Sequence, residues 1–140
     1  PESHDAFHDR NTRLFRATEA LARAVHGAVA SSGDFYVTHP SLTNHPNHSF
    51  SEDHLVHGSS PVFYIQCTGE TDQYQLAETL WANPITQQHA ELGQSFGFDH
   101  ARILPNTNYP VVRIAGGYST DTDALGAAFA ESLAKEQQHV

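Results

Sequence analysis

The sequence predicts an α+β domain in which helices cover a small, mainly antiparallel sheet of about four strands. Two observations support this class. Helical patterns occupy residues 10–30 and 119–140 at the two ends, and short runs of β-branched and aromatic residues lie between them. The order of helices and strands is that of an α/β sandwich. A chain of 140 residues suits one domain with one core, so we expect a single domain over residues 1–140.

The first predicted helix covers residues 10–30. Its apolar residues Leu14, Leu21, Val25 and Ala28 recur at spacings of seven, four and three, which places them on one stripe. The arginines of the same segment fall on other faces, where they meet solvent: Arg10, Arg13, Arg16 and Arg23. This helix should therefore lie on the sheet with one face only.

Three segments are predicted as strands, at residues 34–40, 60–69 and 109–117. The second has the strongest signal, because Val62 through Ile65 form a near-continuous apolar run that we interpret as buried. Between the first two strands, Ser51 is expected to cap a short turn of helix that ends near His57.

Two further segments complete the predicted order. Thr71 or Asp72 should cap a helix that Pro84 stops, and residues 85–98 are interpreted as a strand running into a glycine-rich turn. In the last helix, Ser119 or Thr120 is the expected cap. Its packing residues are Leu125, Phe129 and Leu133.

Composition narrows the possible functions. The formal charge is −9 with only seven basic residues, so the chain lacks the cationic face that a nucleic-acid-binding protein needs. No window approaches the roughly 20 apolar residues of a membrane span. Cys67 is the one cysteine, so the fold does not depend on an internal disulfide, and we expect a cytoplasmic protein. Lys135 is the one lysine, and its place near the end of a charged helix favours a solvated cation.

Arg113 is the most unusual residue, because it lies inside the apolar strand "VVRIAGG" just before two glycines. A charge within a sheet needs a partner, an edge or a cleft. One interpretation is an arginine on the solvated face of a half-exposed strand. The other is an arginine that holds a carboxylate with both arms of its planar guanidinium, in an open cleft at one edge of the sheet.

The histidine-rich stretch "VTHPSLTNHPNH" and the residues after it allow a second hypothesis. His45 and His48 lie three residues apart, as do His54 and His57, and this spacing suits metal ligands on a helical turn. No thiolate lies nearby, and Pro46 restricts the first pair, so surface imidazole is favoured. A binding module that uses these histidines for a divalent metal stays open as the alternative function.

The order of motifs resembles the C-terminal small domain of the Cys/Met-metabolism family of pyridoxal-phosphate enzymes, of fold type I. "RNTRLFRATEALARAV" is similar to the helix that opens this domain. "THPSLTNHPNH" keeps Pro40, Leu42, His45, Pro46 and His48 of the next segment. "GSSPVFYI", "ELGQSFGF" and "VVRIAGG" stand in the places of the family's glycine-rich strand, its Ser-Leu-Gly-Gly element and its "VRLSVG" strand, so the resemblance covers residues 10–135.

The resemblance implies a substrate site. In the family the arginine of the "VRLS" strand binds the substrate's α-carboxylate, so Arg113 takes this role, with Glu91, Gly93 and Ser95 beside it. Two positions depart from the family: Glu91 replaces the serine before Leu-Gly-Gly, and Gln94 replaces the second glycine. Glu91, as the nearest acid in motif order, is a possible partner of Arg113.

The resemblance also implies partners. The lysine that carries pyridoxal phosphate and the phosphate-binding loop belong to the family's large domain, and this chain has no counterpart of that domain. We therefore expect a small domain or one subunit of a split, oligomeric lyase or transferase, inactive alone and bound to pyridoxal phosphate only through a large-domain partner. The substrate would be an amino acid with a leaving group at Cβ or Cγ.

Overall fold

The computed structural model describes residues 3–39, 62–93, 99–117 and 120–137. The histidine-rich stretch after His39 and the short helix expected from Ser51 lie outside these residues. The elements, in chain order, are α1 (His4–Val29), β1 (Phe35–Thr38), β2 (Val62–Cys67), α3 (Gln73–Ala82), α4 (Pro84–His89), β3 (Ala90–Leu92), β4 (Ala101–Pro105), β5 (Val111–Ala115) and α5 (Thr122–Gln137).

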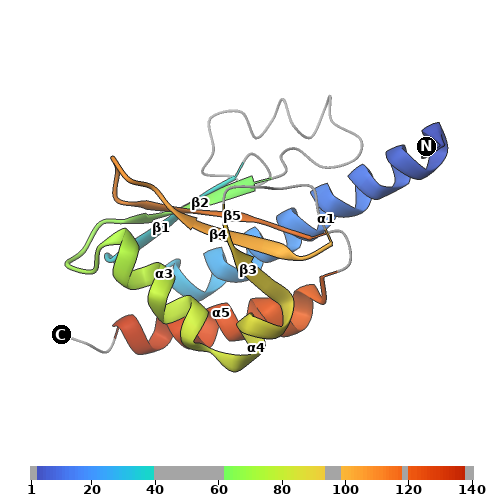
Figure 1. Cartoon of the computed structure of the whole chain (residues 1–140). Coiled ribbons are helices and arrows are strands. Elements are labelled where there is room, and N and C mark those ends of the chain that lie inside the picture. Colours follow the sequence, from blue (N-terminus) through green and yellow to red (C-terminus); the bar gives the residue numbers. More distant parts are fainter. Residues whose placement is uncertain (1–2, 40–61, 94–98, 118–119, 138–140) are drawn as a thin grey trace.

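The predicted α+β class is confirmed, with five strands among the described residues instead of about four. The strand order is β1-β2-β5-β4-β3, and all pairs are antiparallel except β3 with β4. Figure 1 shows the helices gathered on one side of this sheet, with the first turns of α1 extending beyond it. None of the described helices has the length and apolar character needed to cross a bilayer.

Helix α1 begins earlier than the sequence predicted, at His4 instead of residue 10. The Ser3 hydroxyl accepts a hydrogen bond from the N–H of Ala6 at 3.1 Å and so caps the helix. The predicted apolar stripe is confirmed, because Leu14, Leu21 and Val25 are all buried.

The core lies between the helices and the sheet face that they cover. Phe63, Ile65, Val112 and Ile114 from the two inner strands have no exposed surface. From the helices, the fully buried partners include Leu21, Val25, Leu76, Leu80, Leu125, Phe129 and Leu133. One face of the sheet therefore packs against the described helices and forms the core. The other face has no described helix against it.

The predicted end of the helix before Pro84 is confirmed, but the strand predicted from residue 85 is wrong. Asn83 caps the end of α3, and its side chain accepts the Ile85 N–H at 3.0 Å to start α4. Proline suits the first position of α4, since its missing N–H is not needed there. Residues 84–89 are thus helical, and among the described residues of the predicted strand only Ala90–Leu92 are extended.

The C-terminal half contains two other differences. Strand β4 was not predicted, because "ARILP" lies between the segments at 85–98 and 109–117 that were interpreted as strands. The cap of α5 is Asp121 and not Ser119 or Thr120, since its carboxylate accepts the Ala124 N–H at 3.1 Å. For α3, Asp72 is the cap, which confirms one of the two expected residues.

A buried carboxylate joins α5 to α3. Glu136 is 6% exposed, and its oxygens accept hydrogen bonds from Thr71 Oγ1 at 3.1 Å and Gln75 Nε2 at 3.4 Å, and also from Thr79 Oγ1. Three donors replace the water that the carboxylate loses on burial. This network fixes the end of α5 against α3.

Gly116, the first of the two glycines after β5, allows α1 to lie close to the sheet. A Cβ at Gly116 would lie 2.7 Å from both the backbone nitrogen and Oγ1 of Thr18. Thr18 Oγ1 instead accepts the Gly116 N–H at 3.0 Å and donates to the Leu14 carbonyl oxygen at 3.0 Å. Close packing against α1 therefore explains Gly116, whereas a Cβ at Gly117 would meet the backbone of Asp99 and His100 instead.

We predict that Gly116→Ala lowers the free energy of unfolding by roughly 1–3 kcal/mol, the usual range for overpacking. The added methyl group must displace backbone atoms of α1, which cannot move independently. Gly27→Ala is the matched control, because a methyl group added at this exposed position of α1 would meet nothing within 4 Å. There alanine should raise stability by roughly 0.5–1 kcal/mol through helix propensity. Urea unfolding followed by circular dichroism tests both, and equal stability of Gly116→Ala and the parent chain would contradict the packing argument.

Candidate functional site

Arg113 lies in the central strand of the sheet, on the face that the described helices leave uncovered (the helix-free face). Its neighbours Val112 and Ile114 are fully buried in the core, so alternation along β5 directs Arg113 to the opposite face. The residue is half-buried there. The expected position at one edge of the sheet is wrong, because β5 pairs with β2 on one side and β4 on the other.

The strand register gives Arg113 defined neighbours. Tyr64 of β2 is directly opposite it on one side, and Leu104 of β4 is directly opposite on the other. Thr38 of β1 pairs with Tyr64 and continues the same row. Tyr64 is 39% exposed, so the predicted continuous burial of β2 is wrong, and the strand instead alternates between core and open face.

Of the other predicted site residues, the structure brings Gly93 towards the row that contains Arg113. Gly93 follows Leu92, which pairs with Ile103, and its N–H donates to the Ile103 carbonyl oxygen at 3.1 Å. Gly93 therefore lies beside Leu104, two strands from Arg113. Its φ of 151° favours glycine, so the turn after β3 depends on this residue. Ser95 lies outside the described residues.

Glu91 forms an ion pair with Arg102, a residue that the sequence patterns did not bring forward. The two residues are register partners in β3 and β4, so their side chains leave the sheet on the same face. Arg102 pairs with Ala115, two residues along β5 from Arg113, which makes the two arginines diagonal neighbours on one face. The same signal that distinguishes Arg113, a cation inside an apolar strand, could have identified Arg102 in "ARILP".

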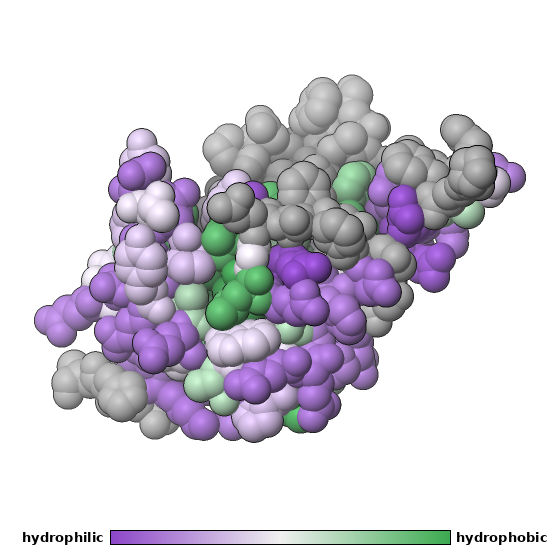
Figure 2. Space-filling view, viewed as in Figure 1, coloured by the Kyte–Doolittle hydropathy of each residue, from purple (hydrophilic) through white to green (hydrophobic). Residues whose placement is uncertain are grey.

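Two hollows flank this region. One lies between α3 and the β3–β4 edge, is lined by Tyr74, Trp81, Leu92 and Leu104 among others, and has a volume of about 280 Å³. Figure 2 shows apolar surface gathered over this edge, beside polar surface. The other lies on the open face near the turn that joins β4 to β5, with a volume of about 500 Å³.

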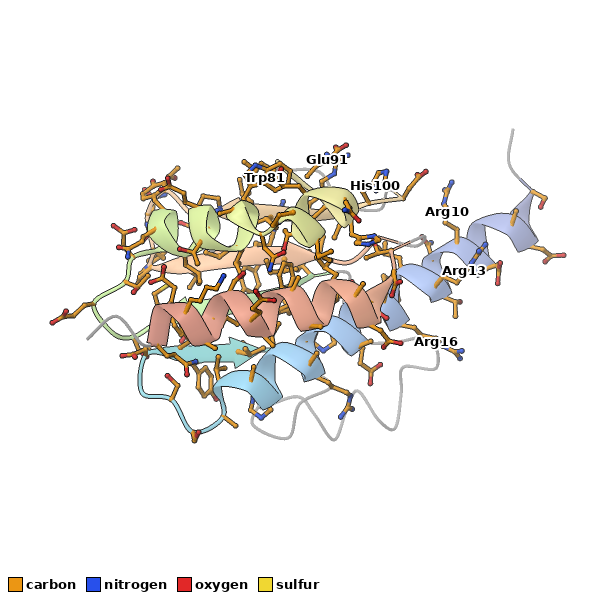
Figure 3. All side chains as sticks on the ribbon, turned by 90° about the horizontal axis from the view of Figure 1, so that it is seen from below. Arg10, Arg13, Arg16, Trp81, Glu91 and His100 are labelled. Carbon is orange, nitrogen blue, oxygen red and sulfur yellow. The ribbon has the colours of Figure 1, made fainter. Side chains whose placement is uncertain are left out.

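The β3 edge of the sheet and helix α1 carry different side chains. Figure 3 shows Trp81, Glu91 and His100 along the β3 edge, whereas Arg10, Arg13 and Arg16 project from the N-terminal half of α1. Arg13 pairs with Asp9 at 2.8 Å on the same helix. Pairs of this kind, exposed and four residues apart, stabilise a helix by a few tenths of a kcal/mol, so they need no functional explanation.

The residues of this chain do not fit a Schiff base with pyridoxal phosphate. Lys135 lies in the last turn of α5, its side chain is 66% exposed, and its Nζ lies 3.5 Å from the Glu131 carboxylate. A Schiff-base lysine needs a desolvated site that favours the neutral amine. The predicted solvated position of Lys135 is confirmed.

No group of three or more histidine, cysteine or acidic side chains within the described ranges is arranged to hold a metal ion. The histidines that motivated the metal hypothesis, His45, His48, His54 and His57, fall outside those ranges. The metal-binding alternative therefore stays a hypothesis.

Cys67 ends β2 and borders the larger hollow, but it is a poor nucleophile. Burial raises the pKa of its thiol to about 11, and the negative charges of Asp72 and Glu136 add to the shift. Only the thiolate reacts readily, and it is scarce at neutral pH. Cys67 therefore serves as a small buried apolar residue.

Comparison with known proteins finds likeness in structure only. No family model matches the sequence, and no curated protein is similar to it. One similar structure is assigned as an O-acetylhomoserine (thiol)-lyase from Campylobacter jejuni and was solved with a pyridoxyl-lysine monophosphate residue. It is 16% identical with a TM-score of 0.65, and the match covers 88% of this chain and 28% of that one. Yeast cystathionine gamma-lyase is 17% identical with a TM-score of 0.61, over 89% of this chain and 34% of that one.

A methionine gamma lyase from Micromonospora echinospora is 18% identical with a TM-score of 0.60, and the match covers 86% of this chain and 31% of that one. At these identities the likeness shows the fold. The chain spans about a third of the length of each of these solved structures.

We predict that iodoacetamide alkylates Cys67 about a hundredfold more slowly at pH 8 in the folded chain than in urea, because a pKa of about 11 instead of 9.0 lowers the thiolate fraction by that factor. Since the chain has one cysteine, mass spectrometry of the whole protein follows a single reaction. Equal rates in the folded and unfolded states would show that Cys67 is accessible and ionised, and would reopen a nucleophilic role.

Proposed function

We propose that this chain is the small-domain part of a pyridoxal-phosphate enzyme of the Cys/Met-metabolism family. In this proposal it works with a large domain, either joined to it or as a separate subunit of an oligomer. Its substrate is an amino acid that carries a leaving group at Cβ or Cγ, and the outcome is elimination or replacement. The chain alone has no catalytic activity.

The observation that carries the proposal is the match of nearly the whole chain to about a third of three solved structures, a (thiol)-lyase and two gamma-lyases, each at a TM-score of 0.60 or above. A match of this extent supports a likeness over most of this chain rather than over one shared motif. The order of motifs in the sequence supports the same assignment independently, since it depends on residue types and their spacing and not on the shape of the fold.

Within this function, Arg113 holds the α-carboxylate of the substrate. The guanidinium is planar and always charged, so it can donate two parallel hydrogen bonds to a carboxylate. The backbone of Arg113 belongs to the central strand. This strand is paired on both sides, so it is a rigid support for the side chain. It lies on the face that no described helix covers, where a second domain can approach.

Glu91 and Arg102 form an ion pair on the same face of the sheet as Arg113. Because the Glu91 carboxylate pairs with Arg102, the acid that replaces the family's serine has a cation of its own. The acid at position 91 is therefore held by a cation other than Arg113. This arrangement supports carboxylate binding despite the departure at position 91.

The partner must supply the cofactor site. When bound, pyridoxal phosphate stabilises the carbanions that elimination and replacement require. The contribution of this chain is to bind and orient the substrate through Arg113 and to cover the reacting atoms from one side. Both tasks require that the helix-free face, which carries Arg113, lies against the large domain.

We predict that Arg113→Gln weakens amino-acid binding by roughly 1.5–3 kcal/mol, or roughly ten- to a hundredfold in Kd, when the chain is combined with its large-domain polypeptide. The loss reflects hydrogen bonds to a charged group. Arg23→Gln is the matched control, because Arg23 pairs with Glu19 on α1 at 3.1 Å, away from the open face. Isothermal calorimetry with the assembled protein measures both; an Arg113→Gln variant that binds as tightly as the control would contradict the assignment.

We also predict that the chain alone forms no internal aldimine with pyridoxal phosphate at its single lysine. Lys135 is solvated and ion-paired, so it lies in no desolvated pocket that would hold a Schiff base. The absorbance spectrum of a mixture, dialysed against buffer, should show no retained cofactor. Retention that disappears in Lys135→Ala would place a cofactor lysine in this chain and contradict the need for a partner.

A further inference from the structure

The larger hollow lies on the helix-free face, at the end of the sheet where β2 and the β4–β5 turn meet. Two tyrosine rings, Tyr64 and Tyr109, and the side chain of Val111 give it apolar walls. Gln66, Thr68 and Asn106 add amide and hydroxyl groups. Its volume of about 500 Å³ falls within the usual range for small-molecule sites, which are mostly apolar with a few polar groups that orient the ligand.

The β4–β5 turn, which forms one wall of the hollow, is preorganised by its own hydrogen bonds. The Asn106 side-chain oxygen accepts the N–H groups of Asn108 at 2.7 Å and Tyr109 at 3.0 Å, and the Asn106 N–H donates to the Val111 carbonyl oxygen at 2.9 Å. The Cys67 N–H donates to the Pro110 carbonyl oxygen at 2.8 Å and ties the turn to β2. Such a turn holds Tyr109 beside the hollow at little entropic cost on binding.

Arg113 adjoins this hollow without forming part of its wall. It is directly opposite Tyr64 in the sheet and two residues from Val111 along β5, so all three side chains share one face. Cross-strand and same-face neighbours of this kind lie roughly 5–7 Å apart, within the reach of an arginine side chain. A cation therefore stands next to an apolar hollow in a chain whose net charge is −9.

We infer that this hollow receives the side chain of the substrate, an α-amino acid whose leaving group at Cβ or Cγ carries a planar, apolar ring. Arg113 holds the carboxylate, and the ring lies against Tyr64 and Tyr109, since aromatic rings favour offset or edge-to-face contact with each other. Gln66 and Asn106 offer hydrogen bonds to a polar substituent at the far end. The inference rests on the proposed function and assigns the part of the substrate that this chain recognises.

Three probes separate the two parts of the inference, and all are tested on the isolated chain by nitrogen-edited NMR. 3-Phenylpropanoate has both the ring and the carboxylate, 3-phenylpropanol has the ring alone, and propanoate has the carboxylate alone. We expect 3-phenylpropanoate to shift the amide signals of Tyr64, Gln66 and Val111. It should bind at least several-fold more tightly than either partial probe, because only it uses both contacts.

Two exposed tyrosines provide matched variants. Tyr109 is 67% exposed and lines this hollow, whereas Tyr74 is 51% exposed and lines the hollow between α3 and the β3–β4 edge. Neither lies in the core, so both alanine variants should fold. Tyr109→Ala should weaken 3-phenylpropanoate binding by about fivefold, the scale of an aromatic contact, and Tyr74→Ala should leave it unchanged.

Arg113→Gln completes the test. It should weaken binding of 3-phenylpropanoate and leave 3-phenylpropanol unaffected, which together with the Tyr109→Ala loss supports the inference. Sensitivity to Arg113→Gln but not to Tyr109→Ala would overturn the inference and keep the proposed carboxylate role. Sensitivity to Tyr109→Ala but not to Arg113→Gln would overturn the joint site and count against that role.

Two other outcomes would also overturn the inference. Shifts centred on the indole N–H of Trp81, lost in Tyr74→Ala, would place the ring in the hollow beside α3. No shift with any probe at concentrations up to tens of millimolar would show that the hollow does not bind carboxylates of this class.

Discussion

The alternation of side chains along β5 is the constraint on which the rest of the structure depends. Val112 and Ile114 are fully buried beneath the helices, so Arg113 between them must face the other way. Because β5 is paired on both sides, this direction cannot be changed by a shift in register without moving core residues into solvent. The same strand therefore specifies the core and places the one arginine that the proposed function requires.

The class of fold could be predicted because helical periodicity was clear in α1 and α5, and because apolar, β-branched runs marked β2 and β5. The region from residue 84 to 105 could not, since its elements are short and its apolar residues fit several patterns. A six-residue helix that begins at Pro84 and a three-residue strand carry too little periodic signal to separate them from a turn. The pairing of Glu91 with Arg102 depends on the parallel register of β3 and β4, which no local pattern specifies.

The helix-free face has the residue composition of an interaction surface. Tyr36 and Tyr64 are 43% and 39% exposed on it, and Tyr109 at 67% stands at its border. Exposed aromatic groups beside an arginine are typical of binding surfaces, where rings supply contact area and the cation supplies orientation. This character is consistent with a chain that spans about a third of each solved structure it matches, and it favours the side opposite the helices for the proposed contact with a large domain.

The central claim is that the helix-free face around Arg113 binds carboxylates. The most direct measurement is the NMR signal of each arginine side-chain Nε–H group during titration with propanoate, with propanamide as the uncharged control. The account predicts that the Arg113 signal moves with propanoate and not with propanamide, while the signal of Arg23 on α1 stays in place. Movement of the α1 arginines to the same extent, or an Arg113 signal that does not respond at all, would contradict it.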